Sequence, residues 1–400
     1  MREHRRAGAV VFIAGRFCAM KKDRHPAGSA VWDFWERAVS GRYEADGRVR
    51  MFLTPARVLW TTDSPEAEVE NAPALLRRRD PQVSLERQEP CVLKNSGAHA
   101  AVLLDFGIEV YGGVQLFIGG GEHPAETGRI RLRFGESAME AMSEPGEHNS
   151  GNYHSLRDFA VPVPHLGTYE SNCTGFRFVR IDLLDEDSFL EIQSIRAFAF
   201  WKDIPYVGDF RCDDERLNRI WRVGAYTVHL NMQQGYIWDG IKRDRLVWSG
   251  DIFTEIRTIE AVFGMDDSIA RSLDFVRDRT PLPGWMNQMP TYSMWWILSQ
   301  VSFYRYHGDI GYLRQQAGYL RGLARQLAES IAPDGHSATP PTHFIDWETL
   351  DDREATDAGI QALHTMALSA AGRLFRILDD GESASRCEAA LAGLSAYRPA

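Results

Sequence analysis

The segment from Asp239 to Asp251 concentrates the residue types that acid–base chemistry requires. It reads Asp-Gly-Ile-Lys-Arg-Asp-Arg-Leu-Val-Trp-Ser-Gly-Asp, with three carboxylates at positions 239, 244 and 251 and three cationic side chains between them. An exposed turn tolerates such charges but does not need tryptophan, whereas a buried turn must pair every charge. The segment is therefore either a functional site or a structural turn, in which the outer aspartates cap helices and the arginines pair with them.

Cleavage of a glycosidic bond is one reaction that this composition suits. It requires a carboxylic acid that protonates the leaving oxygen and a carboxylate that activates water. We expect Asp244 to be the acid, because its two flanking acids raise its pKa by like-charge repulsion while Trp248 excludes water. Arg243 and Arg245 would oppose this rise if they faced Asp244, and the sequence does not give their direction.

Two further groups of aromatic and acidic residues follow. Within Thr342-His-Phe-Ile-Asp-Trp-Glu348, Asp346 is a candidate to bind a sugar hydroxyl and Trp347 to stack on a sugar ring, although a tryptophan at a helix start also packs into cores. Tyr292 and Trp296 belong to an aromatic group at helical spacing. We expect one of this group to line the cleft and most of it to pack in the core.

Charge and motif content exclude several other classes of function. The net charge is −10 with both signs interspersed, which disfavours a nucleic-acid partner, and no apolar run of about 18 residues predicts a membrane span. The chain lacks HExxH, GxSxG, P-loop and dinucleotide-binding patterns, so no metal or cofactor is expected. The five cysteines show no metal-ligand spacing, which favours free thiols and a cytoplasmic location.

The hydrophobic pattern changes along the chain. Short apolar segments bounded by Gly, Pro, Asn or Asp predict strands at 101–106, 114–118, 129–134, 176–183 and 189–199, with turns at Gly112-Gly113 and at Gly119 to Gly121. Helical periodicity then predicts seven helices, at about 213–233, 250–263, 268–277, 293–307, 310–331, 356–378 and 384–395. Such a chain has a multidomain β + α fold, in which an antiparallel β-sandwich precedes stacked helical hairpins.

The composition also predicts where the domains begin and end. Residues 1–28 are expected to be disordered or to result from a misplaced start, residues 29–205 to form the β-sandwich, and residues 206–400 to form the helical domain.

The segment Asp239 to Asp251 resembles the signature of the family 78 α-L-rhamnosidases, Asp-x-x-x-Arg-x-Glu-x-x-x-Trp-x-x-Asp. The likeness continues through Tyr292-Ser-Met-Trp-Trp296 and Phe344-Ile-Asp-Trp347, and covers most of the chain after about residue 95. It implies a β-sandwich followed by an (α/α)6 six-hairpin barrel that removes terminal L-rhamnose from oligosaccharides or glycosides with inversion. It also implies that Asp239, Arg243, Trp248 and Asp251 grip the sugar, that Asp244 is the general acid, and that Asp346 and Trp347 bind substrate.

Some features depart from the family pattern. The segment is one residue shorter, and aspartate replaces the usual glutamate, so the leaving-group site is expected to differ. A complete barrel has twelve helices, so we expect an incomplete barrel, with the catalytic base beyond Ala400 and with uncovered apolar helix faces. The alternatives are a carbohydrate-binding protein without turnover and a six-hairpin glycosidase or lyase that acts on another sugar. The oligomeric state is left open by the sequence.

Overall fold

The computed structural model describes residues 37–39, 42, 46–85, 89–122, 127–153, 155–339 and 342–397. The chain divides into two units, Met1–Asp46 and Gly47–Ala400, and every element below belongs to the second. The segment 1–28, for which the sequence predicts disorder or a misplaced start, lies outside the described residues.

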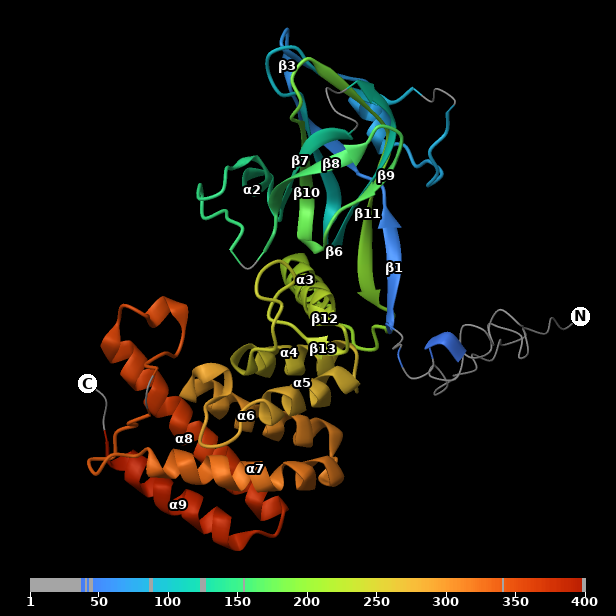
Figure 1. The fold of residues 1–400 in the computed structure, drawn as a ribbon. Coiled ribbons are helices and arrows are strands. Elements are labelled where there is room, and N and C mark those ends of the chain that lie inside the picture. Colours follow the sequence, from blue (N-terminus) through green and yellow to red (C-terminus); the bar gives the residue numbers. More distant parts are fainter. Residues whose placement is uncertain are drawn as a thin grey trace, which may run out of the picture. The chain divides into compact units, whose positions relative to one another are not determined.

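The first part of the second unit, here called the β region, consists of antiparallel strands (Figure 1). All of these strands belong to one hydrogen-bonded sheet of eleven strands: β1 (Arg48–Leu53), β2 (Arg57–Thr61), β3 (Asp63–Ser64), β4 (Ala67–Glu70), β5 (Cys91–Asn95), β6 (Ala101–Glu122), β7 (Thr127–Gly135), β8 (Asp158–Pro164), β9 (Gly167–Glu170), β10 (Thr174–Leu183) and β11 (Ser188–Lys202). A 3-10 turn, η1 (Ala72–Leu76), and a short helix, α2 (Ala138–Met142), interrupt them. The prediction of antiparallel β structure is confirmed, but one continuous sheet replaces the two separate sheets of a simple sandwich.

The length of β6 explains this continuity. Its first residues pair with β2 and β10, whereas its last ones pair with β11 and β9. The predicted turns at Gly112-Gly113 and at Gly119 to Gly121 are both wrong, because all of these glycines lie inside β6. A Cβ atom at Gly112 would collide with the backbone of Phe198 on β11, and one at Gly113 with the Phe198 ring, so these glycines permit close strand packing rather than a reversal of the chain.

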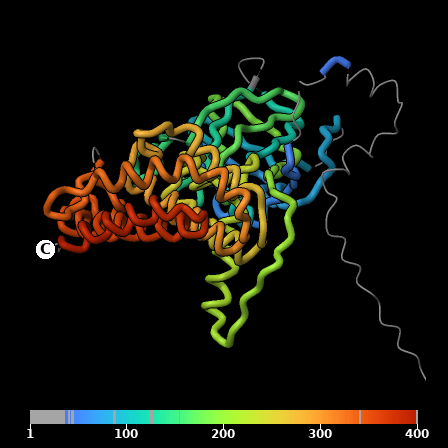
Figure 2. The backbone as a smooth tube through the Cα atoms, turned by 90° about the horizontal axis from the view of Figure 1, so that it is seen from below, coloured from blue at the N-terminus to red at the C-terminus, as the bar shows by residue number. Residues whose placement is uncertain are grey.

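The second part, here called the helical region, has seven helices among its described residues, at the predicted positions. They are α3 (Glu215–Asn231), α4 (Ser249–Val262), α5 (Asp267–Asp278), α6 (Pro290–His307), α7 (Ile310–Glu329), α8 (Arg353–Ile377) and α9 (Gly381–Ala396), with the 3-10 turns η2 (Met286–Gln288) and η3 (Trp347–Thr349). The aspartates Asp214, Asp266, Asp309, Asp352 and Asp380 each cap a helix by accepting a backbone N–H bond. Figure 2 shows α7, α8 and α9, in orange and red, side by side.

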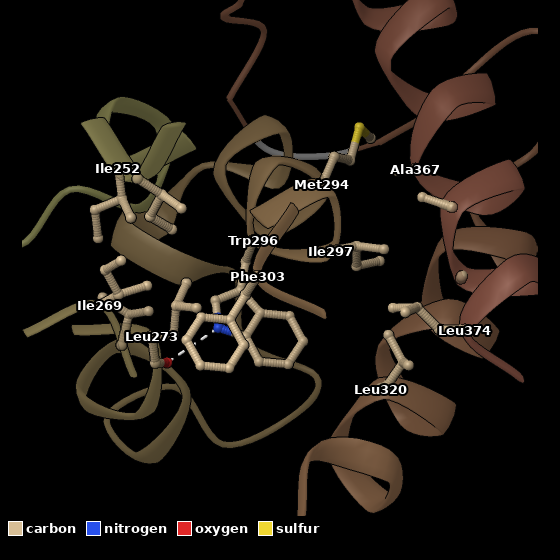
Figure 3. Packing of buried hydrophobic residues seen from close by; sticks show 14 of the residues in the cluster. Ile252, Ile269, Leu273, Met294, Trp296, Ile297, Phe303, Leu320, Ala367 and Leu374 are labelled. Atoms are coloured by element: carbon tan, nitrogen blue, oxygen red, sulfur yellow. Dashed lines mark hydrogen bonds between the residues drawn. The ribbon is translucent and has the colours of Figure 1, made fainter. Parts of the chain in front are cut away.

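The apolar faces of these helices form one core. Ile252 of α4, Leu273 of α5, Trp296 of α6 and Leu320 of α7 are fully buried and pack together with Leu374 of α8 (Figure 3). The exposed side of α4, α6 and α8 borders a hollow of about 730 Å³, which is lined by apolar side chains and by three arginines. Within the described residues, no helix has the length and apolar character needed to cross a membrane.

Candidate active site

A tight hairpin presents the segment 239–251. Strands β12 (Met232–Gln233) and β13 (Tyr236–Ile237) follow α3 directly and are joined by Gln234 and Gly235, both of which have positive φ angles, as such two-residue turns require. The Ile237 N–H donates to the Ser272 hydroxyl on α5, 2.9 Å away. The chain therefore enters the segment from a fixed point.

Residues 239–246 form a closed loop. The Asp239 N–H donates to the Leu246 carbonyl at 3.1 Å, and the Leu246 N–H donates back to Asp239 Oδ1 at 2.9 Å. Between them the chain reverses through Asp244 and Arg245, which adopt φ angles of 56° and 55° in the left-handed region. Such strained positions persist where the surroundings hold them and are frequent at functional sites.

The start of α4 is held against α6. Asn287 accepts a bond from the Ser249 N–H at 3.0 Å and donates to the Val247 carbonyl at 3.2 Å. The absence of a side chain at Gly250 is essential, since a Cβ atom there would collide with the Tyr292 ring. The sequence Trp-Ser-Gly-Asp therefore brings Tyr292 over the first turn of α4, next to Asp251.

The carboxyl groups of this region lie close enough to influence one another. Burial raises the pKa of Asp239 to about 6, and the negative charges of Asp244 and Asp251 add to this rise. The pKa of Asp251 is also raised, first by loss of water around its carboxylate and then by the charges of Asp346 and Asp244, while a hydrogen bond from Tyr292 opposes the rise. The structure thus gathers the four predicted acids, Asp239, Asp244, Asp251 and Asp346.

Glu255 is an additional acid that the sequence analysis missed. Its Oε1 accepts a bond from Asn231 Nδ2 at 3.0 Å, whereas its Oε2 is buried without a hydrogen-bond partner among the described residues. Burial raises the pKa of Glu255 to about 8, and Asp251 and Asp239 add to this rise. These surroundings favour the protonated form of Glu255. Its position one turn after Asp251 on the predicted helix was the signal that could have found it.

Aromatic rings connect the two predicted clusters. Trp248 lies edge-to-face with Tyr292 at a centroid distance of 5.8 Å, Tyr292 contacts Phe344 at 6.3 Å, and Phe344 contacts Trp347 at 5.1 Å. Trp347 is 75% exposed, as a stacking platform must be. The structure does not bring Trp296 to this group. Its ring is fully buried and its indole N–H donates to the Leu273 carbonyl, so it packs in the core (Figure 3).

The arginines do not neutralise the acids that flank Asp244. Among the described residues, neither Arg243 nor Arg245 forms an ion pair with Asp239 or Asp251. Arg243 is exposed, and Arg245 donates to the Cys173 carbonyl at 3.2 Å. The structural interpretation of the segment, in which these pairs hold a turn together, is therefore not what the structure contains.

The described part of the chain contains no group of three or more His, Cys, Asp or Glu side chains arranged to hold a metal ion. The chemistry available at this site is that of carboxyl groups, of the Tyr292 hydroxyl and of indole surfaces.

Comparison with known proteins supports this description. Residues 205–395 match the model of the bacterial alpha-L-rhamnosidase six-hairpin glycosidase domain. No curated protein matches the sequence.

Solved structures share the fold. A rhamnosidase from Klebsiella oxytoca with rhamnose bound is 19% identical with a TM-score of 0.66, over 88% of this chain and 70% of its own. A family 78 rhamnosidase of Bacillus sp. GL1 is 20% identical with a TM-score of 0.61, and the match covers 78% of this chain and 32% of that enzyme. A Streptomyces avermitilis alpha-L-rhamnosidase complexed with L-rhamnose is 16% identical with a TM-score of 0.54, and the match covers 77% of this chain and 31% of that enzyme. The chain thus spans about a third of the length of the last two enzymes.

The matched domain includes the segment 239–251, the aromatic group around Tyr292 and the Asp346-Trp347 pair, which are the residues on which the resemblance was first based. Residues 205–395 therefore have the sequence pattern of a bacterial alpha-L-rhamnosidase six-hairpin glycosidase domain, and the chain shares its fold with family 78 rhamnosidases.

Proposed function

We propose that this protein is an inverting glycoside hydrolase that removes terminal α-L-rhamnose from oligosaccharides or glycosides. The observation that carries the proposal is the group of neighbouring carboxyls at Asp239, Asp251 and Glu255, which have raised pKa values and no guanidinium partner in the described part of the chain, beside an exposed tryptophan. Strongly perturbed carboxyls in such surroundings are typical of functional sites.

The site suits a neutral, hydroxyl-rich ligand. The carboxyl oxygens of Asp251 and Asp346 accept hydrogen bonds from sugar hydroxyls, and the exposed face of Trp347 packs against the apolar side of a sugar ring. Rhamnose carries a methyl group where many hexoses carry a hydroxymethyl group, so an aromatic surface stabilises it further. Tyr292 holds Asp251 in place through its hydroxyl.

Asp244 is the proposed general acid, as the resemblance implies. Its place between Asp239 and Asp251, on a loop turned by two left-handed residues, supports this role. Inversion requires a second carboxylate roughly 6.5–9.5 Å from the acid, so that a water molecule fits between them.

Glu255 has a separate part in this proposal. Because its surroundings favour its neutral form, Glu255 leaves Asp251 as the charged member of the pair on α4. Two adjacent anions would repel each other, and the proton on Glu255 removes that repulsion. We therefore propose that Glu255 is a positioning residue that keeps Asp251 ionised and available to a sugar hydroxyl.

Hydrolysis of aryl glycosides tests the proposed function. The α-L-rhamnoside should be cleaved in preference to the α-L-fucoside and the β-D-glucuronide, and the first product detected by NMR should be the β-anomer. Asp244→Asn should lower kcat by roughly 10²–10⁴-fold, the usual contribution of a general acid. Asp278→Asn, which changes an exposed acid on α5, is the matched control.

An unchanged kcat in Asp244→Asn would remove the acid role from this residue. Tight binding of L-rhamnose without cleavage of any glycoside would favour the alternative of a carbohydrate-binding protein.

A further inference from the structure

A second hollow, of about 390 Å³, lies in the β region and shares no residue with the candidate active site. Four of the described residues that line it are arginines, and none is acidic. Arg77, Arg78 and Arg79 belong to the loop that follows η1, and Arg196 belongs to β11. In a chain with a net charge of −10, this concentration of positive charge is a local feature that attracts anions.

The strand register places Arg196 at one side of the hollow. It lies opposite Gln115 of β6, while β1 runs antiparallel to β11 with Phe52 opposite Phe198 (Figure 1). Because side chains alternate along a strand, Arg196 and Phe198 point to the same face of the sheet. The ring of Phe52 is therefore a diagonal neighbour of Arg196 on that face.

The guanidinium group of Arg196 lies against two aromatic rings. Its central carbon is 3.7 Å from the centroid of the Phe52 ring and 5.4 Å from that of the Phe117 ring. Its Nε donates to Gln115 Oε1 at 2.7 Å. These contacts fix the position of the guanidinium, but neither the rings nor the amide carries a negative charge that would balance it.

No acid among the described residues forms an ion pair with Arg196. The negative charge of Glu170 acts on it from a distance, but this carboxylate is already bonded to Arg50 at 2.5 Å. Burial lowers the pKa of Arg196, and the positive charge of Arg50 lowers it further. Arg177 and Arg180 of β10, in contrast, each lie against a buried aspartate. Arg196 is therefore a partly desolvated cation without a counter-ion in the described part of the chain.

The loop after η1 completes the positive lining. Arg78 is exposed and forms no ion pair within the described residues. Arg77 lies 3.4 Å from the exposed Glu89, and Arg79 donates to the Glu89 carbonyl at 3.3 Å. Since an ion pair between two exposed groups contributes little, Arg77 can exchange this contact for one with a ligand. The loop thus offers cationic groups opposite the strand that carries Arg196.

The remaining lining suits a small organic anion. Leu53, Phe117 and Ile195 supply apolar surface, and Thr54 and Ser194 supply hydroxyl groups. The volume lies near the lower end of ligand pockets, which span roughly 300–1,000 Å³. Guanidinium groups bind the coplanar oxygens of a carboxylate or a phosphate through paired hydrogen bonds. The hollow therefore has the composition of a site for an oxyanion.

We infer that this hollow binds the oxyanion group of a small ligand, either the carboxylate of a sugar acid or a free phosphate, between Arg196 and the arginines of the loop after η1. The oxyanion supplies the counter-ion that Arg196 lacks within the described residues. The inference is independent of the proposed function, since none of the acids around α4 lines the hollow. It gives the β region a ligand-binding role of its own.

Calorimetric titration of the full chain at one fixed ionic strength tests this inference. The ligands are D-glucuronate, inorganic phosphate and D-glucose, which has the same ring as glucuronate but no charge. We expect at least one of the two anions to bind at least roughly tenfold more tightly than glucose, a difference of about 1.4 kcal/mol. Tighter binding of glucuronate than of phosphate would assign the site to a sugar acid, and the reverse order would assign it to free phosphate.

The variants Arg196→Gln and Arg78→Ala should each weaken the binding of the tighter anion by roughly tenfold. Arg78 is exposed, so its replacement tests the site even if Arg196→Gln does not fold. Arg219→Ala, at an exposed position on α3, removes the same charge and is the matched control, which should bind both anions as the parent does.

Absence of binding by both anions, or binding of glucose as tight as that of the anions, would overturn the inference. Unchanged affinity in the folded variants would also overturn it, as would an equal loss in Arg219→Ala, because attraction to net charge alone would then explain the binding. The proposed function would stand in each of these cases, since it is tested with rhamnosides at another site.

Discussion

Acidic residues in the β region and acidic residues around α4 have opposite surroundings. In the β region, Asp105, Asp158, Asp182 and Asp185 are largely buried and each lies against an arginine. Arg177 bonds to Asp105 at 2.8 Å, and these contacts lower the pKa of Asp105. Around α4, Asp239, Asp251 and Glu255 lie near other carboxylates instead, and their pKa values are raised, mainly by burial.

The difference separates structural acids from functional ones. A buried carboxylate that is paired with a cation contributes to the folded state only while both charges are present. Carboxyls that crowd together without a cation oppose folding, and such an arrangement persists where it serves binding or catalysis. The same residue types therefore have different consequences when they are mutated, and these consequences can be measured.

Asp105→Asn should cause the largest loss of stability. We expect the free energy of unfolding at pH 7 to fall by roughly 2–4 kcal/mol, somewhat less than for a fully enclosed pair because Arg57 and Arg177 keep contact with water. Since the pKa of Asp105 is lowered on folding, its contribution is present above the unfolded pKa and is lost as the pH falls through the folded value. Urea unfolding at pH 7 and at pH 3 measures both effects.

In the same experiment Asp278→Asn, at an exposed site, should change stability little. If Asp105→Asn proves as stable as the parent at pH 7, the pairing of Asp105 with arginines does not stabilise the β region.

Glu255→Gln should have the opposite effect. The pKa of Glu255 is raised on folding to about 8, so the parent chain loses stability as the pH rises from the unfolded value of this group to about 8. Glutamine keeps the oxygen that accepts from Asn231 and carries no charge at any pH. The variant should therefore be more stable than the parent at pH 8.5, by up to roughly 1.4 kcal/mol for each unit of the raised pKa.

Thermal unfolding at pH 5 and at pH 8.5 measures this change. If the unfolding temperatures of Glu255→Gln and the parent change with pH in the same way, Glu255 is ionised in the folded chain at neutral pH, contrary to this expectation.

Trp347→Ala should have the smallest effect and should change binding alone. Trp347 is largely exposed, so its removal should leave the unfolding temperature nearly unchanged while the affinity for L-rhamnose falls by roughly tenfold, or about 1.4 kcal/mol. Leu350→Ala, on the same segment and also exposed, is the control. Unaltered affinity in Trp347→Ala would place the sugar elsewhere.

Periodicity was sufficient to predict the helical region. All seven predicted helices occur within a few residues of their expected bounds, and five of them have an aspartate cap. Glycine was a poorer guide in the β region. Gly112 and Gly113 suggested a turn. In the structure their lack of a side chain instead allows β11 to pack closely against β6, and β11 lies far along the chain, so no local pattern could indicate this contact.

Only part of the candidate site could be predicted, again because some of its contacts join residues far apart in the sequence. Asp239, Asp244 and Asp251 could be identified because they are close in sequence, and the resemblance added Asp346 and Trp347. The contact of Lys242 with Glu136 joins residues 106 positions apart, and no local pattern indicates it. Trp296 and Tyr292 lie on the same helix, and only the packing of α6 against α5 and α4 shows which of them is buried.

Binding of L-rhamnose to Asp251→Asn and to Asp105→Asn tests the central claim most directly, since both variants replace one aspartate by its neutral isostere. At a temperature at which both are folded, calorimetry should show an affinity at least roughly tenfold weaker than the parent for Asp251→Asn and an unchanged affinity for Asp105→Asn. If Asp251→Asn binds L-rhamnose as tightly as the parent, or if the parent does not bind it, the carboxyls around α4 are not the sugar site.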